Sequence, residues 1–267
     1  MPFFRSFDGV KVHYESYGEG LPLILLHGVP GQISNWKHVV KLLEKEYLLV
    51  AMDLRGYGIS DKPEEFKLSD HVRDLEALIQ ELGLSSEGVV LVGHSYGCMV
   101  ALEFASKLDV RGLILVSPPL RLKKDFTDWM ILHLPSWLWK PLLFSSNFLT
   151  RRVYRKMFFS SSVPEEVWNE FMKDNTSYIE SLPPQSFVNP SKLSYDASVY
   201  SGKIKARSLV IVGEEDVVTP ASEARELAEI INAEFLEVPK AGHMVLYEKP
   251  EVIATAVGNF TKDLDLD

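Results

Sequence analysis

Short apolar runs alternate with amphipathic stretches along most of the chain. The runs are rich in β-branched side chains and nearly free of polar residues: Leu23–Leu26, Tyr47–Met52, Val89–Val92, Leu113–Val116 and Leu209–Val212. Such runs are typical of parallel strands that are buried on both faces. Helical periodicity lies between them, at Trp36–Leu43, Asp70–Leu82 and Met99–Leu108. The alternation predicts an α/β fold in which a mostly parallel sheet carries helices on both faces.

Turn and cap residues mark some of the expected boundaries. Phe3–Phe7 and Val10–Tyr17 are β-rich and are joined at Asp8-Gly9, a dipeptide typical of hairpin turns. Ser69 is expected to cap the start of the second amphipathic helix, and Gly83 to end it.

The alternation stops between residues 119 and 190, where the pattern is helical, irregular and interrupted by prolines. Strand and helix patterns resume after Ala206, at Ala221–Ile231, Glu234–Val238 and Pro250–Phe260. We therefore expect one α/β core built from residues 1–118 and 191–267, with residues 119–190 forming a helical cap. A cap inserted between strands is expected to cover the end of the sheet where such folds bind ligands.

Composition and charge exclude several other classes of protein. Hydrophobic residues make up 46% of the 267 positions, which is enough to form a core, and the net charge of −9 disfavours a nucleic-acid partner. The single cysteine, Cys98, rules out an internal disulfide and a cysteine-rich metal site. No run reaches the roughly 18 apolar residues of a membrane helix, and the first residues lack a signal-peptide pattern. We expect a cytoplasmic monomer or homodimer without stable membrane insertion.

A candidate nucleophile lies where an apolar run meets a helix. The sequence Gly93-His94-Ser95-Tyr96-Gly97 follows Val89–Val92 and precedes the helix predicted near Met99. A sharp turn there would hold Ser95 in strained geometry, and the two small glycines would let the turn close. The hydroxyl would then lie at a helix N-terminus, which favours negative charge.

A serine nucleophile needs a base, and the chain contains seven histidines. His243 lies in a loop directly after the last predicted strand, at the same end of the sheet as Ser95, and is the best candidate. His94 is expected to pack in the interior, and His27 to brace a loop. Three others are expected at the surface: His13, His38 and His71. His133, in the insertion, is expected to pack or to contact water.

The base in turn needs a carboxylate to orient it. Three acids, Glu214, Glu215 and Asp216, follow the run Leu209–Val212 and compete for this role. Their position after a strand agrees with a place near the other two groups, but the residues alone leave the choice among them open.

With these residues in view, the chain resembles the α/β-hydrolase superfamily, over approximately residues 3–118 and from 206 onward. The acid-loop pattern of that superfamily, G-x-x-D-x-x-x-P, selects Asp216, and the chain order of serine, acid and histidine also matches. The resemblance assigns the oxyanion hole to the backbone amides of Val29 and Tyr96. It implies a lidded, esterase-like serine hydrolase that takes a small-molecule ester of small to medium acyl size, forms an acyl-enzyme, and needs no cofactor or metal.

Related chemistries stay open where they share these groups. Carbon–carbon bond hydrolases, lactonases and cofactor-free haloperoxidases use the same three side chains, and some relatives act as ligand receptors. Haloalkane dehalogenases and epoxide hydrolases share the loop pattern H-G-x-P, present here from His27 to Pro30, but use an aspartate as nucleophile. Ser95 therefore argues against those two classes.

The apolar stretch Trp129–Trp139 suggests a roof over the acyl site. Trp137 and Trp139 are expected to line that pocket, and their apolar contact would exclude water from the reaction. Tyr57 belongs to a segment similar to the D-x-R-G-x-G-x-S loop of the superfamily. That loop is expected to be mainly architectural, with Tyr57 as a pocket wall.

Overall fold

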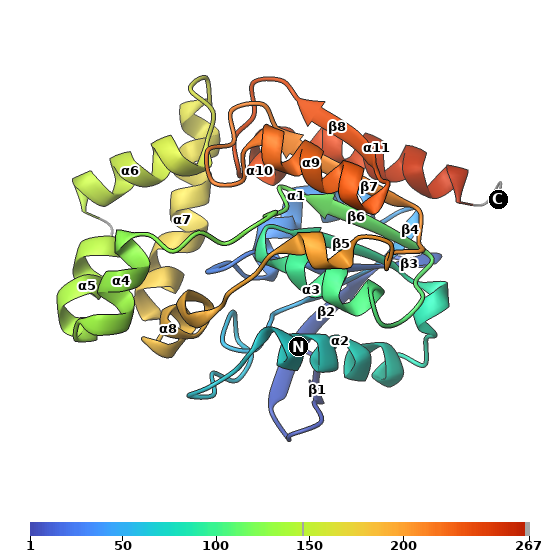
Figure 1. Cartoon of the computed structure of the whole chain (residues 1–267), viewed down its shortest axis with the longest axis horizontal. Coiled ribbons are helices and arrows are strands. Elements are labelled where there is room, and N and C mark those ends of the chain that lie inside the picture. The colour runs from blue at the N-terminus through green and yellow to red at the C-terminus, as the bar shows by residue number, and fades with distance from the viewer. Residues whose placement is uncertain (146, 265–267) are drawn as a thin grey trace.

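A sheet of eight strands forms the centre of the computed structural model, which describes residues 1–145 and 147–264 (Figure 1). Its order is β1-β2-β4-β3-β5-β6-β7-β8, and only β1 and β2 run antiparallel to their neighbours. The strands are β1 (Phe3–Arg5), β2 (Lys11–Tyr17), β3 (Leu21–Leu26), β4 (Tyr47–Met52), β5 (Val90–His94), β6 (Gly112–Val116), β7 (Ser208–Gly213) and β8 (Glu234–Val238). The predicted mostly parallel sheet is confirmed. Residue 146 of the expected cap and residues 265–267 of the expected core lie outside the described residues.

Helices cover both faces of the sheet, as predicted. One face packs on α1 (Lys37–Leu43), α10 (Val245–Glu248) and α11 (Pro250–Asp263), and the other on α2 (Leu68–Glu81), α3 (Tyr96–Ala105) and α9 (Ala221–Ile231). Alternate side chains of β3 enter the hydrophobic cores on the two faces. Leu23 and Leu25 pack on the side of α1, α10 and α11, and Ile24 and Leu26 pack on the side of α2, α3 and α9. Burial on both faces explains why the parallel strands are continuous apolar runs.

The caps of α2 differ in part from the expectation. The helix begins at Leu68, so Ser69 lies inside its first turn and is not the cap. The carboxylate of Asp70 instead accepts a hydrogen bond from the backbone N–H of Lys67, at 2.8 Å. At the other end, Gly83 adopts a φ of +66°, and the helix ends where this glycine predicts.

Five α-helices follow β6 and precede β7 within the described residues. They are α4 (Phe126–His133), α5 (Ser136–Leu143), α6 (Phe148–Phe158), α7 (Glu165–Ser181) and α8 (Gln185–Lys192). In Figure 1 they lie together beyond one end of the sheet. We call them the helical insertion. No helix in the part of the chain described here has the length and hydropathy needed to cross a membrane.

Candidate active site

Ser95 occupies a strained turn between β5 and α3. Its φ of +51° and ψ of −116° fall in a region of backbone conformation that residues other than glycine rarely adopt. The turn needs its flanking glycines because the backbone approaches closely on both sides. A Cβ atom on Gly97 would lie 2.1 Å from the carbonyl oxygen of Leu26, and one on Gly93 would lie 2.6 Å from the backbone nitrogen of Cys98. The predicted turn at Ser95 is therefore present.

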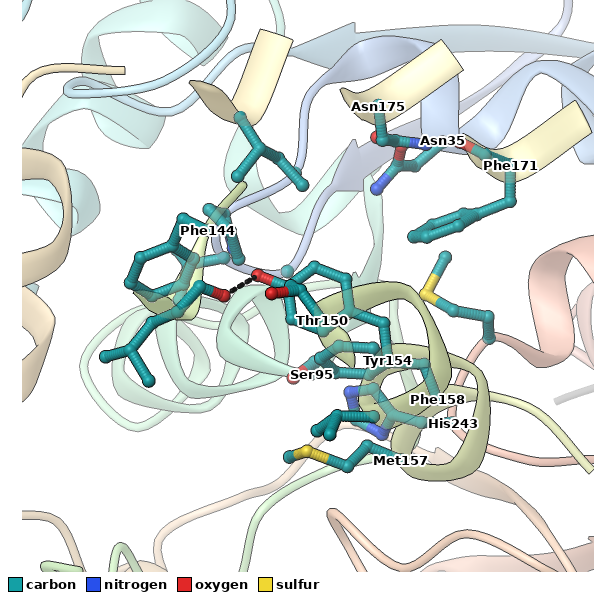
Figure 2. A pocket seen from close by; sticks show the side chains of 18 of the residues that line it. Asn35, Ser95, Phe144, Thr150, Tyr154, Met157, Phe158, Phe171, Asn175 and His243 are labelled. Atoms are coloured by element: carbon teal, nitrogen blue, oxygen red, sulfur yellow. Dashed lines mark hydrogen bonds between the residues drawn. The ribbon is translucent and has the colours of Figure 1, made fainter. Parts of the chain in front are cut away.

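His243 is held by a carboxylate in the loop that follows β8. Its Nδ1 lies 2.9 Å from Oδ2 of Asp216, and both side chains are buried. An ionised carboxylate only accepts hydrogen bonds, so Nδ1 of a neutral His243 carries the proton and Nε2 carries the free lone pair. His243 and Ser95 line the same cavity (Figure 2). The structure thus brings these three predicted residues together.

Asp216 is fixed by its own turn. Its Oδ1 accepts from the backbone N–H groups of Val218 and Thr219, at 2.9 and 2.8 Å, and its Oδ2 accepts from the Thr219 hydroxyl at 2.8 Å. Burial raises the pKa of the carboxyl, but His243 and the hydrogen bonds outweigh it and hold that pKa below its ordinary value. Asp216 is therefore a carboxylate across the neutral range.

The two competing acids bond elsewhere. Glu214 accepts from the backbone N–H of Lys240 at 3.1 Å, and Glu215 accepts from that of Ser161 at 2.7 Å. Both of these contacts are at the surface. Among the described residues, Asp216 is the acid whose carboxylate reaches the ring of His243.

The loop after β3 runs directly beside Ser95. His27 braces it as expected: Nε2 accepts from the backbone N–H of Leu54 at 3.0 Å, so Nδ1 carries the proton and donates to the carbonyl of Gly28 at 2.8 Å. A Cβ atom on Gly28 would lie 2.9 Å from Cβ of Ser95. This close approach places the next residue, Val29, at the nucleophile.

Two backbone N–H groups near Ser95 have no hydrogen-bond acceptor within the described residues. One belongs to Val29, in the loop after β3, and the other to Tyr96, the first residue of α3, whose amide has no acceptor inside the helix. Both residues lie with Ser95 in the wall of one cavity. These are the two amides to which the resemblance assigned the oxyanion hole.

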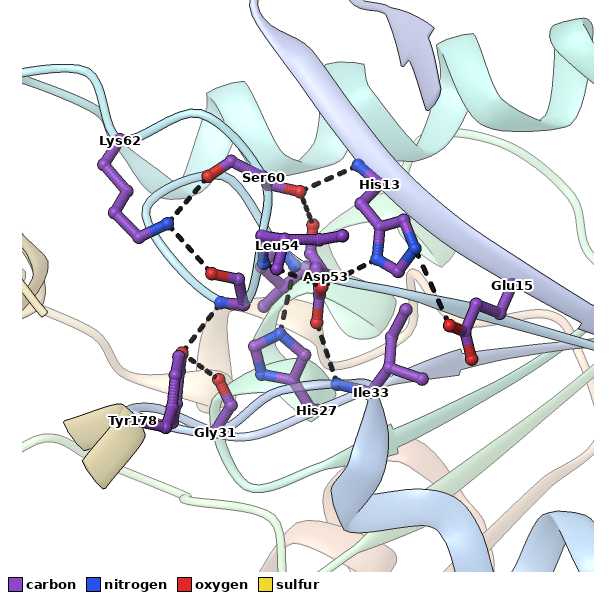
Figure 3. Close-up of polar contacts among 12 residues, drawn as sticks. His13, Glu15, His27, Gly31, Ile33, Asp53, Leu54, Ser60, Lys62 and Tyr178 are labelled. Carbon is purple, nitrogen blue, oxygen red and sulfur yellow. Dashed lines mark hydrogen bonds and ion pairs between the residues drawn. The ribbon is translucent and has the colours of Figure 1, made fainter. Parts of the chain in front are cut away.

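The buried carboxylate of Asp53 bonds to the backbone of two loops, the one that follows β3 and the one that follows β4 (Figure 3). Asp53 accepts from Nδ1 of His13 at 2.8 Å and from the backbone N–H groups of Ile33 and Ile59, at 2.8 and 3.0 Å. Burial raises the pKa of Asp53, but His13, His27 and these amides hold it below the ordinary value. His13 and His71 were expected at the surface and are instead buried. The bonds of Asp53 are consistent with the architectural role expected for the loop Asp53–Ser60.

Ser95 lies between two cavities. The first has a volume of about 350 Å³ and is lined mainly by apolar side chains of α5, α6 and α7. The second, of about 560 Å³, is lined by many more charged and polar groups, including Arg121, Lys123 and Glu223. Ser95, Val29 and Pro30 belong to the walls of both. A substrate can therefore extend from the serine in two directions of different polarity.

The three aromatic residues proposed for the pocket lie outside both walls. Trp139 is buried and packs on Phe144 and Phe187, which makes it part of the core of the insertion. Trp137, two residues before Trp139 and so on nearly the opposite side of α5, is 71% exposed. Tyr57 is fully buried and donates its hydroxyl to the carbonyl of Ser186 at 2.7 Å. These expectations were wrong; the insertion reaches the cavity through other side chains, such as Phe171.

His94 has a contact that the sequence did not reveal. Its Nε2 donates to the backbone carbonyl of His243 at 3.0 Å, across 149 residues of sequence. Burial, and then the neighbouring His243, lower the pKa of His94 to about 3. His94 therefore stays neutral and joins the nucleophile turn to the loop of the base.

Comparison with known proteins places the chain among hydrolases. A family model described as the alpha/beta hydrolase family matches residues 23–256. Epoxide hydrolase 3 of Xenopus tropicalis is 27% identical over 96% of this chain and 76% of its own length. Epoxide hydrolase 4 of Mus musculus is 37% identical, but that match covers 47% of this chain and spans only about a third, 36%, of the relative.

Solved structures agree in fold across the whole chain. A thermophilic esterase from Thermogutta terrifontis superposes with a TM-score of 0.84 at 25% identity, covering 98% of both chains. An esterase from Exiguobacterium antarcticum gives 0.83 at 23% identity, covering 97% of this chain and 98% of its own.

Proposed function

Because the chain belongs to the alpha/beta hydrolase family, we propose that this hydrolase uses Ser95 to cleave carboxylic esters through an acyl-enzyme. The observation that carries the proposal is the 2.9 Å contact between His243 and Asp216, beside the same cavity as a serine in a strained turn. The contact supplies a base with a fixed tautomer, and the cavity supplies room for a substrate.

The reaction follows from the positions of these groups. His243 Nε2 takes the proton of the Ser95 hydroxyl as the oxygen attacks the ester carbonyl, and Asp216 stabilises the imidazolium that forms. The amides of Val29 and Tyr96 donate to the oxyanion, each worth on the order of 3 kcal/mol of transition-state stabilisation. His243 then protonates the leaving alcohol, and water releases the acid by the same steps in reverse order.

The two cavities support a proposal that the acyl and alcohol parts of the substrate bind in different places. In the proposal, the acyl group occupies the apolar 350 Å³ cavity and the alcohol leaves through the polar 560 Å³ cavity. Residues 119–190 act as a cap, because α5, α6 and α7 supply most of the apolar wall. An apolar wall excludes water and strengthens the electrostatic interactions at Ser95.

The nucleophile also separates this proposal from the activity named for two of the relatives. A carboxylate that opens an epoxide forms an ester, which water can hydrolyse. A serine that opens an epoxide forms an ether, which is inert under the same conditions. Ser95 therefore favours acyl transfer over epoxide opening.

A fluorophosphonate probe combined with an ester assay tests the proposal. We expect the probe to label Ser95 and steady turnover of short and medium acyl esters, and Ser95→Ala should abolish both. Ser106→Ala is the matched control, because that hydroxyl donates to the carbonyl of Glu103 at the far end of α3. Labelling that persists in Ser95→Ala would overturn the assignment. A stoichiometric burst followed by a stall would instead indicate a ligand receptor.

A further inference from the structure

Asn35 places an unpaired carboxamide in the wall of the 350 Å³ cavity (Figure 2). The residue lies in a short 3₁₀ helix (Ile33–Trp36) and is only 5% exposed. Its Oδ1 is closed off and has no hydrogen-bond partner, whereas Nδ2 is not closed off and has no acceptor within the described residues. A buried carboxamide is costly unless its donor and acceptor are bonded, so a polar partner from the ligand is the natural complement.

Two other polar side chains of the same wall are already bonded. The Asn175 amide donates to the carbonyl of Phe171 at 2.9 Å, and the Thr150 hydroxyl donates to that of Leu142 at 3.2 Å. Asn35 therefore differs from both in having its donor and acceptor free. In a mostly apolar cavity, the few unpaired polar groups, here Asn35 and Nδ1 of His94, fix the orientation and identity of a ligand.

The position of Asn35 indicates which part of a ligand it would meet. A Cβ atom on Gly31 would lie 2.6 Å from Nδ2 of Asn35, so the carboxamide packs against the loop that carries Val29. The same loop is closed by a hydrogen bond from the Gly31 N–H to the carbonyl of Gly28, at 2.7 Å. Asn35 thus lies against the loop that carries Val29, in the wall of the acyl cavity.

We propose that Asn35 binds a hydroxyl group on the acyl part of the substrate, so that hydroxyacyl esters are the favoured substrate class. Nδ2 of Asn35 is the carboxamide atom that stays open and unbonded, and the oxygen of a substrate hydroxyl accepts the hydrogen bond that it offers. A site built to bond such a group discriminates against an analogue without it, because the buried amide then stays unpaired. The inference rests on the proposed esterase function of Ser95.

Matched esters test this inference. Hydrolysis of ethyl hexanoate, ethyl 2-hydroxyhexanoate and ethyl 3-hydroxyhexanoate is followed by pH-stat in the wild type and in Asn35→Leu. We expect one hydroxy ester to exceed ethyl hexanoate in kcat/KM by about tenfold or more in the wild type, and Asn35→Leu to remove that preference. Thr150→Val, which removes a hydroxyl that already has a partner, should leave the ratio of the rates unchanged.

The outcomes separate this inference from the proposed function. Labelling of Ser95 with equal or slower cleavage of both hydroxy esters, or a preference unchanged in Asn35→Leu, overturns the role of Asn35 alone. Absence of labelling and of any ester cleavage overturns the proposed function, and with it this inference. If Asn35→Leu does not fold, Asn35→Ala provides the same comparison with a smaller side chain, and labelling of Ser95 reports that its site is intact.

Discussion

At the scale of single residues, the charge of Asp216 has no substitute in its loop. Asp216→Asn keeps the size of the side chain but replaces the carboxylate by a neutral amide. The amide neither fixes the tautomer of His243 nor stabilises its imidazolium, so turnover should fall by about 10⁴. Glu215→Gln is the matched control, since that carboxylate bonds to Ser161 at the surface, and its effect should be much smaller. Steady-state kinetics of the two variants compare these effects. A larger loss in Glu215→Gln would show that the wrong carboxylate was chosen.

The pH dependence of the reaction follows from the same group of residues. A base must be neutral to accept a proton, and histidine is the side chain that gains its charge as pH falls from 8 to 5. Asp216 stays ionised over that range because its pKa is held below its ordinary value, and His94, with a pKa of about 3, stays neutral. We expect kcat/KM to fall on acidification, because a protonated base cannot take the proton of the nucleophile.

A pH–rate profile from pH 5 to 9 measures this effect, with His94→Gln as the control. The glutamine keeps an N–H donor for the carbonyl of His243 but cannot act as a base, so the acid limb should persist in that variant. A profile that is flat over the whole range would contradict a histidine base.

Residues that act through distant partners escaped sequence reasoning. Ser95 and Asp216 could be predicted because glycine spacing and loop patterns are local signals. Other roles depend on hydrogen-bond partners, or on their absence, in the folded chain, as for His94, Thr219 and Asn35. The neighbouring sequence contains no signal for these roles. His13 was misplaced for the same reason, since its partner Asp53 is 40 positions away.

At the scale of elements, an ion pair ties α2 to the start of the sheet. Arg55 is buried and donates from Nε and from one terminal nitrogen to Asp74 of α2, each at 2.6 Å, and it also bonds Asp8 in the hairpin between β1 and β2. Asp74→Ala should lower the free energy of unfolding by about 3–5 kcal/mol, because it leaves a buried guanidinium without its main partner.

Denaturant unfolding followed by circular dichroism checks this expectation. Asp8→Ala serves as the comparison, since the Asp8 side chain is 34% exposed and water can replace it. The loss in that variant should be clearly smaller. Equal losses in the two variants would show that burial of the pair does not decide its contribution.

The strands were more predictable than the insertion, for a physical reason. A parallel strand buried on both faces must be apolar at every position, so its signal is continuous. The helices α4–α8 pack on one another as well as on the core, and their apolar positions therefore do not show which neighbour they face. Trp139 illustrates this: it was expected to line the pocket, and it packs instead on Phe144 and Phe187.

At the scale of the whole molecule, hydrogen bonds fix the insertion to the core. Tyr178 of α7 donates its hydroxyl to the carbonyl of Gly31 and accepts from the N–H of Gly58, at 2.7 and 2.8 Å. Ser186 of α8 donates to the carbonyl of Gly56 at 2.7 Å. The insertion therefore touches both loops that support the nucleophile, and the cavity beside Ser95 exists because the two parts meet there.

Since the apolar cavity has a finite volume, it should limit the length of the acyl chain. Each methylene that enters the cavity contributes about 0.8 kcal/mol, or about fourfold in kcat/KM, until the wall stops it. Phe171 of α7 forms part of that wall, so Phe171→Leu should move the preferred acyl length upward by about one or two carbons. A series of acyl esters of increasing length measures the optimum. Trp137→Ala is the control, because Trp137 is 71% exposed and lies outside the wall. An optimum that stays fixed in Phe171→Leu, or that moves in Trp137→Ala, would show that the acyl chain lies elsewhere.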